Sequence, residues 1–118
     1  LPIWFKPENG LEHDWPLSGF VFTNNGFAEL AKMANQATRL AWLKDIRRDL
    51  PLLFMNGLND PLINKGQDLD KLAKALKKND FINVTFQTYD HRGHEIFMYS
   101  GTEIVFNDLL AWIDKQAG

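Results

Sequence analysis

The amino-acid sequence predicts an α/β fold, and three segments carry this prediction. Residues 51 to 56 form a continuous apolar run closed by Gly57, which is typical of a strand buried on both faces of a parallel sheet. Residues 66 to 79 place apolar side chains at helical spacing, and residues 83 to 89 alternate between two faces. Strand, helix and strand in this order make a βαβ unit, which implies parallel strands joined by a right-handed crossover.

The chain before the first strand is predicted to be irregular and then helical. Residues 1 to 22 have no regular period and hold three of the five prolines. Thr23-Asn24-Asn25 supplies helix-capping side chains. Apolar residues then recur at helical spacing, at Phe27, Leu30, Ala34, Ala37 and Ala41. We expect a helix over about 26–35, a second short helix over 37–46, and a solvated stretch of mixed charge over 45–49.

The later elements follow from the same patterns. The helix over 66–79 is amphipathic, with apolar positions at i, i+3, i+4 and i+7 (Leu69, Leu72, Ala73 and Leu76). The strand over 83–89 is expected to be half-exposed and near a sheet edge. Ser100-x-x-Glu103 is a capping-box signature for a final helix. The apolar face of that helix is predicted to comprise Val105, Leu109, Trp112 and Ile113.

The size of the predicted sheet indicates that it is incomplete. A parallel pair of strands must be covered on both faces, and isolated two-stranded units are marginal. We therefore expect a missing N-terminal part of the same fold that carries further strands; a self-contained small fold is the alternative. Within the chain, residues 1–49 are predicted to form an irregular and helical segment, and residues 50–118 the strand-helix-strand-helix segment.

Composition bounds the possible functions. A chain of 118 residues is one domain at most, and 45% hydrophobic with 24% charged residues is ordinary for a globular protein. The net charge of −2 gives no long-range attraction to nucleic acid. No apolar run approaches the length of a membrane span. Cysteine is absent, which excludes disulfides and fits a reducing compartment, so we expect a cytoplasmic protein without a membrane span.

Two loops carry the candidate chemistry. Gly57-Leu58-Asn59-Asp60-Pro61 follows the first strand, and Arg92-Gly93-His94-Glu95 follows the second. Functional groups of parallel sheets gather at the carboxyl ends of the strands, so Asp60 and His94 are predicted to meet on one rim. A carboxylate that accepts a hydrogen bond from one imidazole nitrogen leaves the other nitrogen as a general base. Asp60 and His94 are therefore the predicted catalytic residues.

Simpler readings of the same loops stay open. Either loop taken singly is more often a turn, because Asp before Pro favours turns. His91 and His94 form a His-x-x-His pair that could bind a metal, but no third ligand lies nearby in the sequence. Glu95 is expected to cap the following helix.

Asn56 and Asn59 are expected to be turn residues. His13-Asp14 is expected to be solvated. Neither Ser18 nor Ser100 has the Gly-x-Ser-x-Gly flanks of a nucleophile elbow, so no nucleophile can be assigned within the chain.

Over about residues 11 to 116 the chain resembles the C-terminal portion of α/β-hydrolases, in the branch of monoacylglycerol lipases, lysophospholipases and serine aminopeptidase-like enzymes. The segment from Pro51 to Pro61 is similar to the strand and loop that carry the triad acid of that family. Tyr89-Asp-His-Arg-Gly-His94-Glu95 is similar to its histidine loop, and the final helix with Asp108 and Trp112-Ile113 to its last helix. Asp14-Trp15 and 19–23 resemble the family's cap, although the stretch between them is shorter than in relatives.

The resemblance implies the C-terminal fragment of a serine hydrolase. The intact enzyme would cleave a small-molecule ester or lipid, or less often an amide, through an acyl-enzyme, with no metal or organic cofactor. Its serine and oxyanion hole would lie upstream of residue 1, so the chain alone would be inactive. Phe20, Phe22 and Phe27 would line an apolar pocket or, more commonly for such residues, pack in the core.

Two other hypotheses stay open. The first is that the chain encodes a non-catalytic α/β module used for binding or assembly. A different nucleophile, Asp or Cys, in the same framework would also fit these residues and would change the reaction.

Overall fold

The computed structural model describes residues 23–98 and 100–118, so the expectations for residues 1–22 lie outside the described part of the chain. The first helix, α1, spans Asn24–Thr38 and is followed by a 3-10 helix, η2, at Leu40–Asp45. Then come strand β1 (Leu52–Gly57), the 3-10 helix η3 (Pro61–Gly66), helix α2 (Gln67–Lys78), strand β2 (Val84–Tyr89) and helix α3 (Thr102–Ala117). The predicted order of helices and strands is confirmed; η3 was not predicted.

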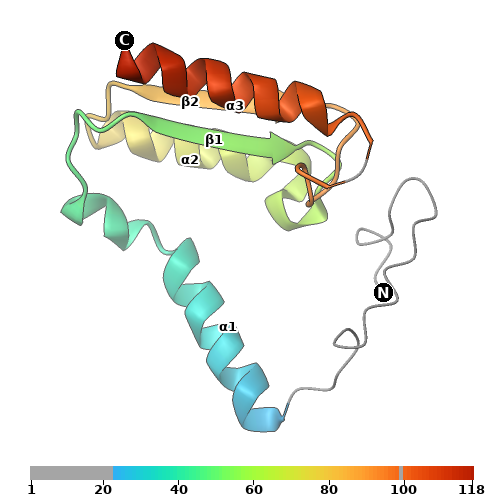
Figure 1. Ribbon diagram of the computed structural model, residues 1–118. Coiled ribbons are helices and arrows are strands. Elements are labelled where there is room, and N and C mark those ends of the chain that lie inside the picture. The colour runs from blue at the N-terminus through green and yellow to red at the C-terminus, as the bar shows by residue number, and fades with distance from the viewer. Residues whose placement is uncertain (1–22, 99) are drawn as a thin grey trace.

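The two strands form a parallel sheet, as predicted. Their register runs from Leu52 opposite Val84 to Gly57 opposite Tyr89. Because the strands are parallel, their carboxyl ends lie at the same end of the sheet. Helix α2 lies along one face of the sheet and α3 along the other (Figure 1). This arrangement is a mixed α/β unit with a two-stranded parallel sheet.

The core lies between the sheet, α2 and η2. Leu43, Leu76 and Phe81 are its buried residues, and they belong to η2, α2 and the turn that leads into β2. The rings of Phe54 and Phe86, which lie opposite each other on the two strands, stack with centroids 5.1 Å apart. Partly buried residues that complete this cluster are Trp42, Ile46, Leu52, Leu72, Ala75 and Val84.

Helix α3 is attached to the other face of the sheet by two side-chain hydrogen bonds. The Tyr89 hydroxyl donates to Oδ2 of Asp108 at 2.7 Å, and the indole N–H of Trp112 donates to the Thr85 hydroxyl at 3.3 Å. Val105, a residue of α3, is fully buried. Of the other predicted apolar-face residues, Leu109 and Trp112 are partly buried, and Ile113 is 47% exposed.

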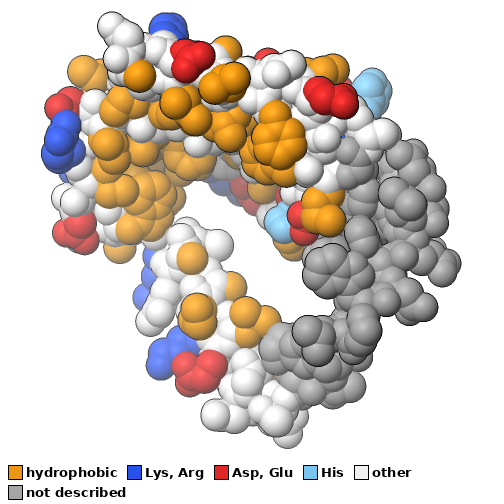
Figure 2. All heavy atoms as spheres, in the orientation of Figure 1, with side chains coloured by type: hydrophobic (Ala, Val, Ile, Leu, Met, Phe, Trp, Pro, Cys, Tyr) orange, Lys and Arg blue, Asp and Glu red, His pale blue; other side chains and the backbone are white. Residues whose placement is uncertain are grey.

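Much apolar surface stays uncovered in the described part of the chain. The residues of β1 before Gly57 are only partly buried, which corrects the expectation of burial on both faces. Helix α1 projects away from the sheet (Figure 1) and has no buried residue. Phe27 is 64% exposed and therefore does not pack in the core. Apolar side chains also gather along α3 (Figure 2), including Phe106 and Leu110, both more than half exposed.

Thr23 caps α1 as predicted, accepting from the backbone N–H of Gly26 at 3.0 Å. Four other local expectations, for Ser100, Glu95, Arg48 and Asn56, are corrected. The N-cap of α3, however, is Gly101 with a left-handed backbone and no side-chain cap bond, so neither Ser100 nor Glu95 caps that helix. Arg48 is not simply solvated, because its guanidinium donates to the carbonyls of Leu43 and Ile46 and lies over the Phe81 ring.

Asn56 is the last of these corrections. It lies inside β1, whereas Asn59 occupies the predicted turn.

Candidate active site

The first loop of the site holds Asp60 in a fixed place. Strand β1 ends at Gly57, and Asp60 is the N-cap of η3, with Pro61 at the first helical position, where the missing N–H of proline costs no hydrogen bond. Oδ1 of Asp60 accepts from the backbone N–H of Leu62 at 2.8 Å. Asp60 as a whole residue is 3% exposed, and it is the one buried polar or charged residue of the described part of the chain. A buried carboxylate needs hydrogen-bond partners, and the second oxygen finds one in the neighbouring loop.

His94 supplies that partner. Its Nδ1 lies 2.8 Å from Oδ2 of Asp60, although the two residues are 34 positions apart in sequence. The imidazole is 40% exposed, whereas the carboxylate is 4% exposed. Because an ionised carboxylate can only accept, this contact requires the proton of the imidazole to be on Nδ1. The predicted meeting of the acid and the histidine on one rim is therefore confirmed as geometry.

Backbone hydrogen bonds join the two loops directly. The N–H of Leu58 donates to the carbonyl of Tyr89, and the N–H of Asn59 donates to the carbonyl of Arg92, each at 2.9 Å. Gly57 lies against the same segment, since a Cβ added there would collide with the carbonyl oxygens of Arg92 and Gly93. The absence of a side chain at position 57 is what permits this approach. The apolar run before Gly57 predicts only that a strand ends there, and this contact leaves no signal in the sequence.

Arg92 is the other residue that sequence reasoning missed. Its guanidinium donates to the backbone carbonyls of Ile96 and Met98 at 3.4 Å each and of Ser100 at 2.7 Å. These carbonyls belong to the segment that connects His94 to α3. The sequence shows only that an arginine stands two residues before His94. That position alone does not distinguish a guanidinium that binds the backbone from one that is solvated.

The remaining candidates do not assemble into a second site. His91 is exposed, and the described residues contain no group of three or more His, Cys, Asp or Glu that could hold a metal ion, so the His-x-x-His pair finds no third ligand there. Ser100 lies just before α3, where its carbonyl is bound by Arg92. Ser18 and His13-Asp14 lie outside the described residues. Across residues 23–98 and 100–118, no helix has the length and apolar character that crossing a membrane requires.

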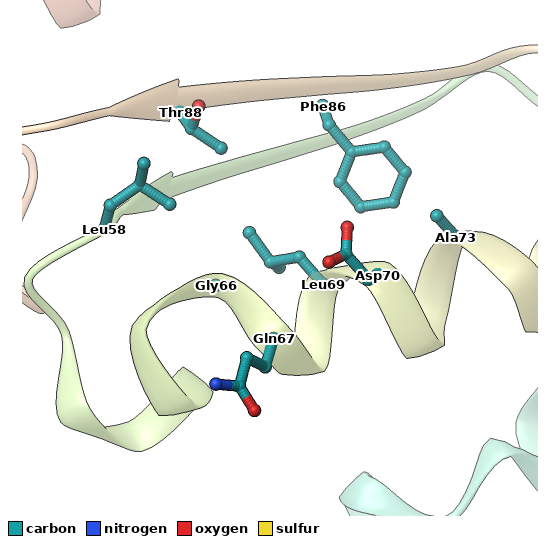
Figure 3. A pocket seen from close by; sticks show the side chains of 8 residues that line it. All are labelled: Leu58, Gly66, Gln67, Leu69, Asp70, Ala73, Phe86 and Thr88. Carbon is teal, nitrogen blue, oxygen red and sulfur yellow. The ribbon is translucent and has the colours of Figure 1, made fainter.

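Two hollows flank α2. One, of about 470 Å³, is walled mostly by apolar side chains from η2, β1, η3 and α2, among them Trp42, Phe54, Leu62 and Leu72. The other, of about 440 Å³, lies between α2 and the sheet. Figure 3 shows Leu69 and Ala73 of α2 pointing toward the sheet across this second hollow, with Phe86 above the helix and Leu58 and Thr88 at one end. Both volumes fall in the range of small-molecule sites, but no polar group of the Asp60–His94 pair lines either one.

Comparison with known proteins adds no family to this geometry. A scan against protein-family models, a search of curated proteins and a search of solved structures each found no match.

Proposed function

We propose that this chain carries the acid and the histidine of a serine-hydrolase triad and forms the C-terminal part of an α/β-hydrolase. The observation that carries the proposal is the 2.8 Å contact between Nδ1 of His94 and Oδ2 of Asp60. A buried acid behind a partly exposed imidazole is the arrangement that fixes the tautomer and presents Nε2 as a base. The resemblance of both loops to the family's acid and histidine loops supports the same assignment.

The proposed reaction is the hydrolysis of an ester through an acyl-enzyme. Nε2 of His94 takes the proton of a serine hydroxyl as its oxygen attacks the ester carbonyl carbon. The same nitrogen then returns that proton to the alcohol that leaves when the carbon–oxygen bond breaks. Water, activated in turn by His94, releases the acid. Asp60 stays ionised and stabilises the imidazolium that forms at each step.

The serine is proposed to lie upstream of residue 1, in a segment that also completes the sheet. Two features of the described residues support this. The sheet has only two strands, and the exposed apolar residues on α1 and α3 are of the kind that normally pack against further elements. On this proposal the 118 residues by themselves do not turn over substrate.

The test uses the intact protein, meaning these residues with whatever upstream segment the gene encodes. We expect it to hydrolyse a short-chain nitrophenyl ester and to react covalently with a fluorophosphonate probe. His94→Ala should reduce kcat by about 10³-fold or more, because removal of a triad member leaves only binding and oxyanion stabilisation. Asp60→Asn should lower kcat strongly without abolishing binding.

His91→Ala is the matched control, since His91 is an exposed imidazole three residues from His94. It should retain the activity of the wild type. Ester turnover that survives His94→Ala would overturn the proposal. An intact protein that folds, has no nucleophile elbow and does not react with the probe would favour the non-catalytic α/β module instead.

A further inference from the structure

Arg92 links the elements that surround the Asp60–His94 pair. Its backbone carbonyl accepts from Asn59, the residue before Asp60, and its backbone N–H donates to Tyr89 at the end of β2 at 3.3 Å. Its guanidinium reaches forward to the segment after His94. One residue thus contacts the acid loop, the end of the second strand and the connection to α3.

The guanidinium contacts are concentrated on a segment without regular structure. The described residues between β2 and α3 are 90–98, 100 and 101, and the backbone N–H of Met98 donates to the carbonyl of Glu95 at 3.2 Å. The carbonyls of Ile96 and Met98 lie outside the described helices and strands, so hydrogen bonds from a side chain fix the path of the chain there. The planar guanidinium carries five N–H donors in a rigid fork, which allows it to bind several carbonyls at once.

Gly101 shows how closely this segment is fitted to Arg92. A Cβ added at Gly101 would lie 2.7 Å from Nη2 of Arg92. The backbone of Gly101 also has a φ of 77°, in the left-handed region that favours glycine. The residue before α3 therefore lies directly against the guanidinium.

We propose that Arg92 is a positioning residue for His94: its guanidinium holds the carbonyls of Ile96, Met98 and Ser100, so that the imidazole stays on the Asp60 carboxylate with Nδ1 protonated. The hydrogen bond that it protects, 2.8 Å between Nδ1 and Oδ2, is short and depends on direction. A small shift of the loop would lengthen this hydrogen bond, and the proton of the neutral ring would then be free to occupy either nitrogen. The role in catalysis rests on the proposed function, but the effect on the tautomer does not.

The test measures the protonation of the two imidazole nitrogens of His94 by long-range proton–nitrogen NMR on the intact protein labelled with ¹⁵N-histidine. In the wild type we expect a proton on Nδ1 and none on Nε2 at a pH where the ring is neutral. In Arg92→Gln we expect a mixture of tautomers while far-UV circular dichroism stays native. Arg92→Lys should have a smaller effect, since an ammonium keeps the charge but cannot span several carbonyls.

Arg48→Gln is the matched control because Arg48 also donates to two backbone carbonyls, those of Leu43 and Ile46, away from the site. This variant should lose stability and keep the wild-type tautomer. In the ester assay, Arg92→Gln should lower kcat by about 10-fold to 100-fold, the range for a misplaced catalytic group, with little change in KM.

The outcomes separate the two proposals. A folded Arg92→Gln variant with the wild-type tautomer and kcat overturns the positioning role and leaves the proposed function intact. Equal loss of the tautomer in Arg92→Gln and Arg48→Gln also overturns it, because the effect would then follow general destabilisation. A wild type without a proton on Nδ1 contradicts the dyad, and with it both proposals.

Discussion

Gly57 and Arg92 are in backbone contact across the two loops of the candidate site. Gly57 is buried at the last position of β1, opposite Tyr89, and the carbonyl of Arg92 occupies the space that a side chain at position 57 would need. The neighbouring N–H groups of Leu58 and Asn59 donate into the histidine loop. This close approach brings Asp60 within hydrogen-bond reach of His94.

Gly57→Ala should therefore disturb the Asp60–His94 contact indirectly, by separating the two loops. The added methyl group meets backbone oxygens, which cannot rotate away as a side chain can, so the two loops must separate. We expect a loss of about 1–3 kcal/mol in the free energy of unfolding, as for other overpacked sites. Urea unfolding measures this loss, and the NMR tautomer of His94 reports whether the Asp60 contact is kept.

Gly26→Ala is the control for this prediction. Gly26 lies in the first turn of α1, away from both loops, and alanine is favoured over glycine inside a helix by roughly 0.5–1 kcal/mol. This variant should be neutral or slightly more stable. Equal stability of Gly57→Ala and the wild type would mean that the loops do not approach as closely as the structure has them.

The sequence predicted the βαβ unit because its signals are local. Apolar residues at helical spacing in 66–79 and alternation in 83–89 depend only on neighbours in the chain, and Leu76 is buried as the pattern requires. The pairing of Asp60 with His94 was also predictable, since both follow strands whose carboxyl ends share one edge.

The contacts that support the site were not predictable in the same way. Arg92 acts through carbonyls four to eight residues ahead, and Gly57 through a loop some 35 residues away, so neither leaves a periodic signal. The Ser100 capping signature failed because the chain enters α3 through a left-handed Gly101 instead. Phe27 failed as a core residue because none of the residues of α1 is buried.

Leu76→Ala tests the core between α2, η2 and the sheet. Leu76 is 1% exposed and belongs to the cluster with Leu43 and Phe81. Removing its isobutyl group leaves a cavity, and we expect a loss of about 2–5 kcal/mol in the free energy of unfolding. Ile82→Ala is the control, because Ile82 is 84% exposed and its change should stay within about 0.5 kcal/mol. Similar losses in both variants would contradict the assigned core.

Asp60→Asn should reverse the tautomer of His94. The asparagine oxygen can still accept from the N–H of Leu62, which leaves the amide NH₂ facing Nδ1 in place of the carboxylate oxygen. Because the NH₂ donates, Nδ1 must accept and the ring proton moves to Nε2, where it blocks the base. Long-range proton–nitrogen NMR detects this change directly.

Asp68→Asn is the control for that substitution. Asp68 forms an exposed ion pair with Lys71 at 3.1 Å, so its loss should cost at most about 1 kcal/mol and leave His94 unchanged. A His94 ring that keeps its proton on Nδ1 in Asp60→Asn would show that the Asp60 contact does not set the tautomer.

The contact between Tyr89 and Asp108 should make stability depend on pH in the alkaline range. Burial, and then the hydrogen bond to the Asp108 carboxylate, raise the pKa of the Tyr89 hydroxyl above its ordinary value of 10.0. Above that pH the unfolded chain loses the proton while the folded chain keeps it, so the unfolded state binds fewer protons and stability falls as pH rises. The stabilisation that Tyr89 gives the folded chain is thus fully present below the ordinary pKa of tyrosine. It is lost as the pH rises through the raised pKa of Tyr89 in the folded chain.

Tyr89→Phe isolates this effect. At neutral pH it should cost about 1 kcal/mol, the usual net worth of a hydrogen bond, because Asp108 loses its donor. As pH rises from about 8 to about 11, which spans the ordinary tyrosine pKa, the difference in unfolding free energy between wild type and variant should shrink. Asp114→Asn is the control, because Asp114 is exposed on α3, the helix that also carries Asp108. This variant should keep the pH dependence of the wild-type unfolding free energy. A constant difference between wild type and Tyr89→Phe across this range would mean that the Tyr89 hydroxyl titrates alike in the folded and unfolded chains.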